Sequence, residues 1–240
     1  MEQLANKLTF WIKERVLEAK KTGTVVGLSG GIDSAVVAAL CKRAFPDTTL
    51  AAIMPCYSTK IDIVHAYKVA QKFDIRTELI ELETVYDSLI NVLPKEKRYH
   101  LNDKLAQANM KPRLRMITLY YLATQLNYIV VGTGNRSEIA VGYSTKYGDG
   151  GVDILPLGNL VKKQVNALAE YLAIPKEIIS KQPSAGLWKG QTDEGEMGLK
   201  YAELDRYLTT GEANSIVRTK IQAMSAGSAH KRAMPPIPPF

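Results

Sequence analysis

The sequence predicts an α/β fold in which a parallel sheet carries helices on both faces. Short runs of β-branched and apolar residues alternate with longer segments of helical periodicity over residues 1–132. Strands that alternate with helices form βαβ units, and these units give a parallel sheet that is buried on both sides. The chain has 240 residues, of which 46% are hydrophobic and 23% charged. This is enough for one such domain with a packed core, and the balance excludes a disordered chain.

Each predicted element rests on a local pattern. The helices show apolar side chains at helical spacing, as at Leu4, Leu8 and Trp11, whereas the strands are β-branched or apolar runs. In order, we predict helix 4–20, strand 24–28, helix 33–43, strand 49–54, helix 59–73, strand 76–81, helix 82–92, one or two helices over 101–126, strand 128–132 and helix 161–172.

Prolines and capping residues set several of the predicted ends. Pro55 closes the second strand, and the helix at 82–92 must end before Pro94. Ser58 or Thr59 is suited to cap the helix that follows. Pro112 either opens a second helix within 101–126 or kinks a single one.

The net charge of +7 points to anionic partners. It is concentrated in two basic patches, because residues 94–116 contain seven Lys and Arg against two acids, and no acid follows Glu212. Nucleic acid, a membrane surface and phosphorylated small molecules all remain open at this point.

The other compositional features narrow the class of protein. The two cysteines, Cys41 and Cys56, form no Cys-x-x-Cys motif, so the sequence indicates neither a disulfide framework nor a local metal motif. The three histidines are scattered. No apolar run is long enough to cross a membrane, and the charged start is not a secretory signal. We therefore expect a cytoplasmic protein without membrane partners.

A glycine-rich turn follows the first predicted strand. It reads Gly27-Leu28-Ser29-Gly30-Gly31-Ile32-Asp33-Ser34 and leads directly into a helix. Adjacent glycines let the backbone approach a ligand closely, and a helix N-terminus attracts anions. The turn is neither a Walker-type loop nor a Gly-x-Gly-x-x-Gly loop. It resembles the pyrophosphate-binding loop of the ATP pyrophosphatases, a Rossmann-like superfamily that adenylates its substrates.

Further motifs select one branch of this superfamily. They are Gly132-Thr133-Gly134-Asn135-Arg136-Ser137-Glu138, Thr145-Lys146-Tyr147-Gly148-Asp149-Gly150-Gly151, Lys162-Lys163-Gln164-Val165, Pro183-Ser184-Ala185-Gly186-Leu187-Trp188 and His230-Lys231-Arg232. Together they resemble the NAD synthetases over essentially the whole chain. The resemblance implies the last step of NAD biosynthesis, in which ATP adenylates the nicotinate carboxylate of deamido-NAD. Ammonia then displaces AMP.

The resemblance also implies roles for individual residues. The residues implied to bind ATP are those of the loop, Gly27, Leu28, Ser29, Gly30, Gly31, Ile32, Asp33 and Ser34, together with Thr133, Lys162 and Ser184. Asp33 and Glu138 would ligate Mg²⁺, a hard ion that bridges phosphates and prefers oxygen ligands. Simpler interpretations also exist, because Asp33 could be a helix N-cap, Glu138 a solvated acid at a helix start and Lys162 a surface residue.

The dinucleotide and the chemistry involve a second set of residues. Deamido-NAD binding is implied for Arg113, Lys146, Asp153, His230 and Lys231. Arg113 has Arg115 as its rival. Asp149 and Lys162 are the candidate catalytic residues, Asp149 for handling ammonia and Lys162 for stabilising charge. Asp149 could equally be a turn former in its Gly-rich setting.

The expected organisation is one synthetase domain over residues 1–240. Glutamine-using relatives carry an extra amidase domain with a nucleophilic cysteine, so we expect free ammonia as the nitrogen donor. Family members are homodimers, and the apolar faces of the first helix and of 116–126 are candidates for the interface. The Gly-rich segments 142–160 and 181–198 are expected to be functional loops. We expect 181–198 to close over ATP.

Two alternatives compete with the NAD synthetase interpretation. A tRNA-modifying ATP pyrophosphatase fits the positive charge, but the sequence shows no Cys-x-x-Cys and no RNA-binding appendage. A non-catalytic nucleotide-binding module is hard to reconcile with Asp33, Glu138 and Lys162 together. We therefore expect no nucleic-acid partner.

Overall fold

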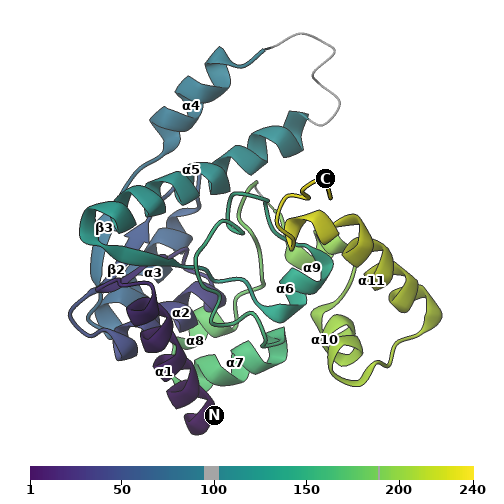
Figure 1. Ribbon diagram of the computed structural model, residues 1–240, viewed down its shortest axis with the longest axis horizontal. Coiled ribbons are helices and arrows are strands. Elements are labelled where there is room, and N and C mark those ends of the chain that lie inside the picture. Colours follow the sequence, from purple (N-terminus) through teal and green to yellow (C-terminus); the bar gives the residue numbers. More distant parts are fainter. Residues whose placement is uncertain (95–102, 189) are drawn as a thin grey trace.

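The computed structural model describes residues 1–94, 103–188 and 190–240, and its centre is a four-stranded parallel sheet (Figure 1). The strands are β1 (Gly23–Gly27), β2 (Thr49–Ile53), β3 (Arg76–Leu79) and β4 (Tyr128–Val131). Their order is β3-β2-β1-β4, and all three pairings are parallel. The predicted α/β class with a parallel sheet is confirmed.

The helices of the amino-terminal half lie close to the predicted ranges. They are α1 (Glu2–Glu18), α2 (Ile32–Ala44), α3 (Lys60–Lys72), α4 (Glu83–Val92) and α5 (Asp103–Leu126), with α7 (Lys162–Tyr171) further along the chain. The predicted cap of α3 is confirmed for Thr59, whose hydroxyl accepts a hydrogen bond from the Asp62 backbone N–H. Positions 101 and 102, where the fifth predicted helix begins, lie outside the described residues.

Pro112 lies inside α5, which runs as one helix over its described length. Of the two possibilities left open by the sequence, the single helix is the correct one. Pro112 and its neighbour Leu114 are buried, so tertiary packing outweighs the hydrogen bond that proline removes.

Helices cover both faces of the sheet, and the strand side chains alternate between two cores. On one face, Val26 and Val131 pack with α1, α2 and α7; on the other, Val25 and Val130 pack with α4 and α5. This alternation is the two-residue period of a β-strand with both faces buried.

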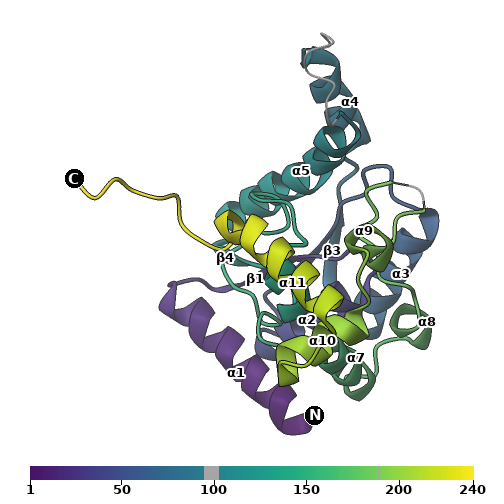
Figure 2. The same ribbon diagram turned by 90° about the vertical axis from the view of Figure 1, so that its right-hand side faces the viewer.

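The carboxyl-terminal half contains helices that the sequence analysis did not assign. They are α6 (Arg136–Val141), α8 (Lys176–Ile179), α9 (Asp193–Met197), α10 (Tyr201–Thr210) and α11 (Ser215–Gly227). Most of them surround a separate small core centred on Leu204 and Ile221, beside the sheet (Figures 1 and 2). The expectation of two long loops without regular structure is therefore wrong in part. Segment 181–198 contains α9, and Ile154 in the other loop forms a parallel bridge with Val131.

The order of the strands decides where a ligand can bind. The chain leaves β1 toward β2 on one side, whereas β4 joins β1 on its other side. The turns after β1 and β4 therefore diverge at the carboxyl edge of the sheet, the switch point at which open α/β sheets bind ligands.

No helix within the described parts of the chain is long and apolar enough to span a bilayer.

Gly30 is required where α3 crosses the turn after β1. Its φ is +78°, and a Cβ added there would lie 2.2 Å from the carbonyl oxygen of Asp62. We expect Gly30→Ala to lower the free energy of unfolding by about 1–3 kcal/mol, because the strained backbone and the close approach are both penalised. Urea denaturation measures this change.

Gly227→Ala is the matched control. Gly227 ends α11, has no atom within 4 Å of an added Cβ and does not need a positive φ. This variant should be neutral or slightly stabilising. Equal stability of the two variants would contradict the packing argument for Gly30.

Candidate active site

The turn after β1 is held open by a small network of hydroxyl groups. The Ser29 and Ser34 hydroxyls lie 3.0 Å apart, and Ser34 Oγ donates to the Gly31 carbonyl at 2.9 Å. Ser34 Oγ also accepts from the Ser29 backbone N–H at 3.2 Å. These contacts shape the turn before α2 begins and use the backbone N–H groups of Ser29 and Gly31 within the turn. The first N–H groups of α2 have no partner inside the helix, which is the feature that anion-binding helix N-termini share.

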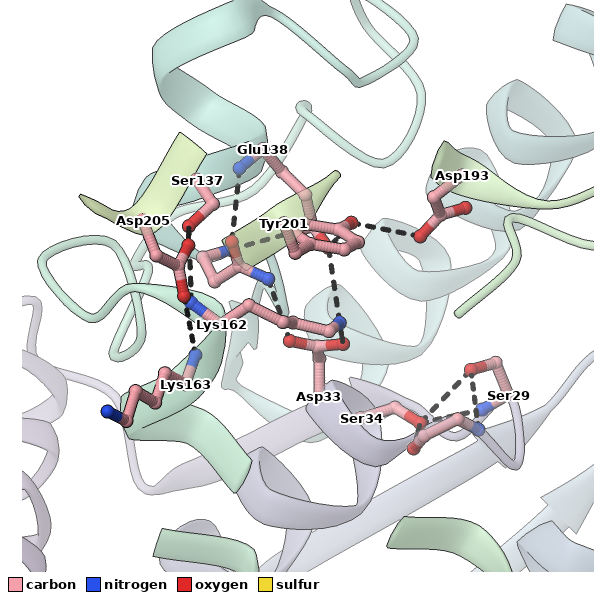
Figure 3. Close-up of polar contacts among 12 residues, drawn as sticks. Ser29, Asp33, Ser34, Ser137, Glu138, Lys162, Lys163, Asp193, Tyr201 and Asp205 are labelled. Atoms are coloured by element: carbon pink, nitrogen blue, oxygen red, sulfur yellow. Dashed lines mark hydrogen bonds and ion pairs between the residues drawn. The ribbon is translucent and has the colours of Figure 1, made fainter. Parts of the chain in front are cut away.

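Three predicted residues from three helices meet beside this turn. The Lys162 ammonium lies 2.5 Å from Asp33 Oδ2 and 3.5 Å from Glu138 Oε1 (Figure 3). Asp33 opens α2, Glu138 belongs to α6 and Lys162 opens α7. Lys162 is only 4% exposed, so it is not a surface residue.

Asn135 links the two turns of the site, and the sequence analysis gave it no role. Its side-chain NH₂ donates to Asp33 Oδ1 at 2.9 Å, and its Oδ1 accepts from the Glu138 backbone N–H at 3.0 Å. Glu138 Oε2 accepts in return from the Asn135 backbone N–H at 3.1 Å. This capping box, Asn-x-x-Glu, was a sequence signal that could have identified Asn135.

Burial and like charge dominate the electrostatics of the cluster. Burial, reinforced by Asp33, raises the pKa of Glu138 above its ordinary value. Burial alone would lower the pKa of Lys162, but Asp33 and Glu138 outweigh it and raise that pKa. Lys162 is therefore protonated, and its single positive charge faces more than one carboxyl group.

Tyr201 and Asp193 extend the cluster and were also missed. The Tyr201 hydroxyl lies 3.0 Å from Asp193 Oδ2 and 3.3 Å from Glu138 Oε1, and Asp193 is buried. Burial raises the pKa of Asp193. The motif Gly-Gln-Thr-Asp-Glu at 190–194 contains Asp193, but its pattern alone did not indicate a role.

A second group of predicted residues gathers around segment 142–151. Lys146 Nζ lies 3.4 Å from His230 Nδ1, and Lys231 Nζ donates to the carbonyls of Gly142 and Ser144 at 2.7 and 2.6 Å. Asp149 accepts from a backbone N–H of this turn at 2.7 Å, and burial raises its pKa. The carboxyl-terminal His-Lys pair is thus fastened to the Gly-rich turn.

Asp153 has both carboxylate oxygens engaged within the protein. Oδ2 accepts from the Val130 backbone N–H at 2.8 Å, and Oδ1 accepts from the Tyr120 hydroxyl at 2.9 Å. It therefore ties its segment to β4 and α5.

The two arginines considered for the dinucleotide differ in their surroundings. Arg113 makes no hydrogen bond or ion pair to a described residue, whereas Arg115 Nε donates to the Met54 carbonyl at 3.0 Å. That carbonyl follows β2, so Arg115 lies at the carboxyl edge of the sheet. Burial lowers the pKa of the Arg115 guanidinium. The basic residues Lys95, Lys97 and Arg98 lie outside the described residues.

Segment 181–198 is joined to α3 and α5. Lys181 forms an ion pair with Asp62, and the Lys111 ammonium donates to the Leu187 carbonyl at 2.7 Å. Ser184 Oγ donates to the Gln191 carbonyl at 2.8 Å. Thr133 is half-buried in the turn after β4.

No cluster of three or more metal-ligating side chains is present among the described residues, which leaves Asp33 and Glu138 as a two-carboxylate pair. Both cysteines are free and buried, and burial raises the pKa of Cys41 to about 12.

The described residues also form an open apolar pocket of about 360 Å³ between β3 and α5. It contains none of the predicted site residues.

Comparisons with known proteins identify the family of the chain. The NAD synthase family model matches residues 4–235. The NH(3)-dependent NAD(+) synthetase of Carboxydothermus hydrogenoformans is 50% identical over 237 residues, with 99% of this chain and 97% of that protein covered.

Solved structures give the same family. An NMN synthetase from Francisella tularensis superimposes with a TM-score of 0.93 at 38% identity, covering 100% of this chain and 98% of that one. An NH3-dependent NAD synthetase from Campylobacter jejuni gives 0.79 at 30% identity, with 98% and 97% covered. The chain therefore belongs to the NAD synthase family, the carbon–nitrogen ligases that amidate deamido-NAD with ammonia at the expense of ATP.

Proposed function

We propose that this chain carries out the whole reaction as one domain over residues 1–240, with free ammonia as its nitrogen donor. The observation that carries the proposal is the Lys162 ammonium held between Asp33 and Glu138 where the strand order reverses. We also propose that the protein is cytoplasmic and binds neither nucleic acid nor a membrane.

The reaction consists of two displacements. An oxygen of the nicotinate carboxylate attacks the α-phosphorus of ATP, and the bond from that phosphorus to pyrophosphate breaks. Ammonia then attacks the carbonyl carbon of the acyl-adenylate, AMP leaves with the electron pair of the C–O bond, and the nitrogen loses a proton. Neither step needs a covalent nucleophile from the protein, which agrees with the two buried cysteines.

The first displacement builds negative charge on the departing pyrophosphate. The N–H groups of the Ser29–Ser34 turn and the positive end of α2 would hold these phosphates. Lys162, already protonated and directed into the cluster, would stabilise the charge that develops. Thr133 would add a hydroxyl donor, and Ser184 would do so by releasing the Gln191 carbonyl to which its hydroxyl donates.

Mg²⁺ fits the pair formed by Asp33 and Glu138. These carboxylates are hard oxygen donors that share a single ammonium in the structure, and Mg²⁺ is typically held by one or two carboxylates together with substrate phosphates. When bound, Mg²⁺ would neutralise phosphate charge and orient the leaving group.

The second group of residues would hold the dinucleotide. Lys146 and Lys231 provide positive charge near the Gly-rich turn, His230 adds an imidazole beside them, and Arg113 adds a guanidinium. Asp149 would act on the incoming ammonia, since a buried carboxyl with a raised pKa is suited to accept a proton. Asp153 would contribute by fixing the segment on which these residues lie.

The direct test is a product assay with purified protein. Deamido-NAD, Mg·ATP and ammonium should give NAD, AMP and pyrophosphate, and glutamine should not replace ammonium. Release of ADP and phosphate, or equal rates with glutamine, would contradict the proposal.

A second substrate is compared in a parallel arm of this assay, because the structure with a TM-score of 0.93 is titled an NMN synthetase. NMN is the nicotinamide mononucleotide half of NAD, so the acid to be amidated would be the corresponding nicotinate mononucleotide. The two acids share the carboxylate, ribose and phosphate. In direct competition, the ratio of the kcat/KM values for the two acids identifies the substrate, and we expect deamido-NAD to be favoured.

Glu138→Gln tests the metal-ligand role without adding bulk. We expect turnover to fall about a hundredfold or more, because the amide replaces a charged oxygen ligand at the phosphates.

In the metal-free protein we expect Glu138→Gln to be more stable than the parent at high pH. A carboxyl whose folded pKa exceeds its unfolded value of about 4.3 binds more protons when folded, so stability falls as pH rises through the folded pKa. The amide of the Glu138→Gln variant does not titrate, so the variant avoids this loss.

The measurement is Tm in EDTA from pH 5 to 9 for variant and parent. The Tm of Glu138→Gln minus the Tm of the parent should increase as pH rises. For Glu170→Gln, a change at an exposed position on α7, the same Tm difference should not vary with pH. A flat profile for Glu138→Gln, or near-parental turnover, would argue against the role.

The face of α5 over 116–126 is our proposed dimer interface. Ile117 and Tyr121 are 59% and 64% exposed, and Tyr121 also lines the apolar pocket against β3. Apolar side chains exposed this strongly on one face favour self-association. We therefore expect Tyr121→Glu to shift the sedimentation of the protein from dimer to monomer.

Phe10→Glu is the matched control on α1, because Phe10 is also exposed on the other candidate face. It should leave the dimer intact. Dissociation by Phe10→Glu and not by Tyr121→Glu would place the interface on α1 instead.

A further inference from the structure

Asp205 on α10 is a buried carboxylate that the reaction as described does not use. It is only 6% exposed. Its Oδ1 accepts from the Ser137 hydroxyl at 2.5 Å, and its Oδ2 accepts from the Lys163 backbone N–H at 2.7 Å (Figure 3). It forms no ion pair within the described part of the chain, so neutral donors alone compensate its charge.

The second of these donors, the Lys163 backbone N–H, lies at the start of α7, a helix whose N-cap residue makes no side-chain cap hydrogen bond. The residue before the helix is Val161, whose aliphatic side chain cannot accept a hydrogen bond. The Lys162 backbone N–H donates instead to Ser137 Oγ at 3.1 Å, and the next N–H donates to Asp205. Ser137 and Asp205 thus cap α7 from two other helices. A carboxylate is stable there because it faces the positive end of the helix.

One of the two residues capped in this way, Lys162, carries a charge of the site. Lys162 is fixed at its backbone by this cap, while its ammonium reaches Asp33 and Glu138 at the other end of the side chain. Ser137 directly precedes Glu138 in α6. One buried carboxylate therefore sets the relative positions of two of the three charged groups in the site.

We propose that Asp205 is a positioning residue for the adenylation step and that it acts through Lys162 and Glu138. The inference rests on the proposed function. It also gives a function to the small core around Leu204, next to Asp205, because that core anchors α10 against α6, and α10 in turn packs on α7. The carboxyl-terminal helices thereby take part in catalysis without touching the substrates.

The test compares Asp205→Asn with the parent in a single-turnover experiment at saturating Mg·ATP and deamido-NAD. The amide keeps the shape of the side chain but offers one acceptor oxygen and no charge. We expect the rate constant of pyrophosphate release to fall about ten- to a hundredfold, because small misplacements of catalytic groups have effects of this size. KM for deamido-NAD should stay within about twofold of the parent, because its proposed contacts lie in the 142–151 group and not at the α7 cap.

The rate constant separates positioning from simple folding. A purely structural role would reduce the reaction amplitude and Tm but leave the rate constant of the folded molecules unchanged, and that result would overturn the proposal. Should Asp205→Asn fail to fold, Ser137→Ala removes the same link with a smaller change and decides by the same criterion.

Glu203→Gln is the matched control on the same helix. Its carboxylate accepts from the Lys200 backbone N–H at the start of α10, and among the described residues it forms no hydrogen bond or ion pair with α6 or α7. Its rate constant should equal that of the parent, and an equal loss in both variants would contradict the proposal. If the parent itself releases no pyrophosphate with either nicotinate acid, the proposed function fails together with this inference. A slow Asp205→Asn beside an active parent supports both.

Discussion

The buried Lys162 ammonium is the constraint on which the site depends. An ammonium that is 4% exposed is stable only if carboxylates compensate the water it has lost, and Asp33 and Glu138 do so from two other helices. The three helices must therefore converge within hydrogen-bonding distance. They do so at the carboxyl edge between β1 and β4, where the turns after these two strands begin and lead in different directions.

Backbone capping makes this convergence rigid. Asn135 joins Asp33 to the start of α6, and Ser137 with Asp205 joins the start of α6 to the start of α7. Each link uses a helix N-terminus, where free N–H groups require acceptors in any case. The groups that satisfy the helix ends thus also set the distances between the charged side chains.

The sequence predicted the sheet and the charged residues better than the connections between them. β-branched runs identify strands such as β1 because buried parallel strands need them, and the turn at Ser29–Ser34 carries a distinctive pattern. Asp205 and Tyr201 escaped notice because their roles depend on tertiary contacts with Ser137, Lys163 and Glu138. No local pattern encodes such contacts. The helices α10 and α11 did carry a local signal, since apolar residues recur at helical spacing on the faces that form their small core, namely Leu204, Tyr207 and Leu208 and then Val217, Ile221 and Met224. They lie outside the alternation of strands and helices on which the other predictions were based.

The charge of the chain and the charge of the site have opposite signs. The chain carries a net charge of +7, yet the centre of the site sets Asp33, Glu138 and Asp193 against one lysine. Phosphates brought to this cluster would meet a local excess of carboxylates, so attraction from the basic surface alone cannot place them there. A divalent cation held by the proposed pair Asp33 and Glu138 would remove this conflict. With the cation bound to Asp33 and Glu138, the Lys162 ammonium would be free to interact with the phosphates. The same two carboxylates would then pair with Lys162 before the cation binds and with the cation afterwards.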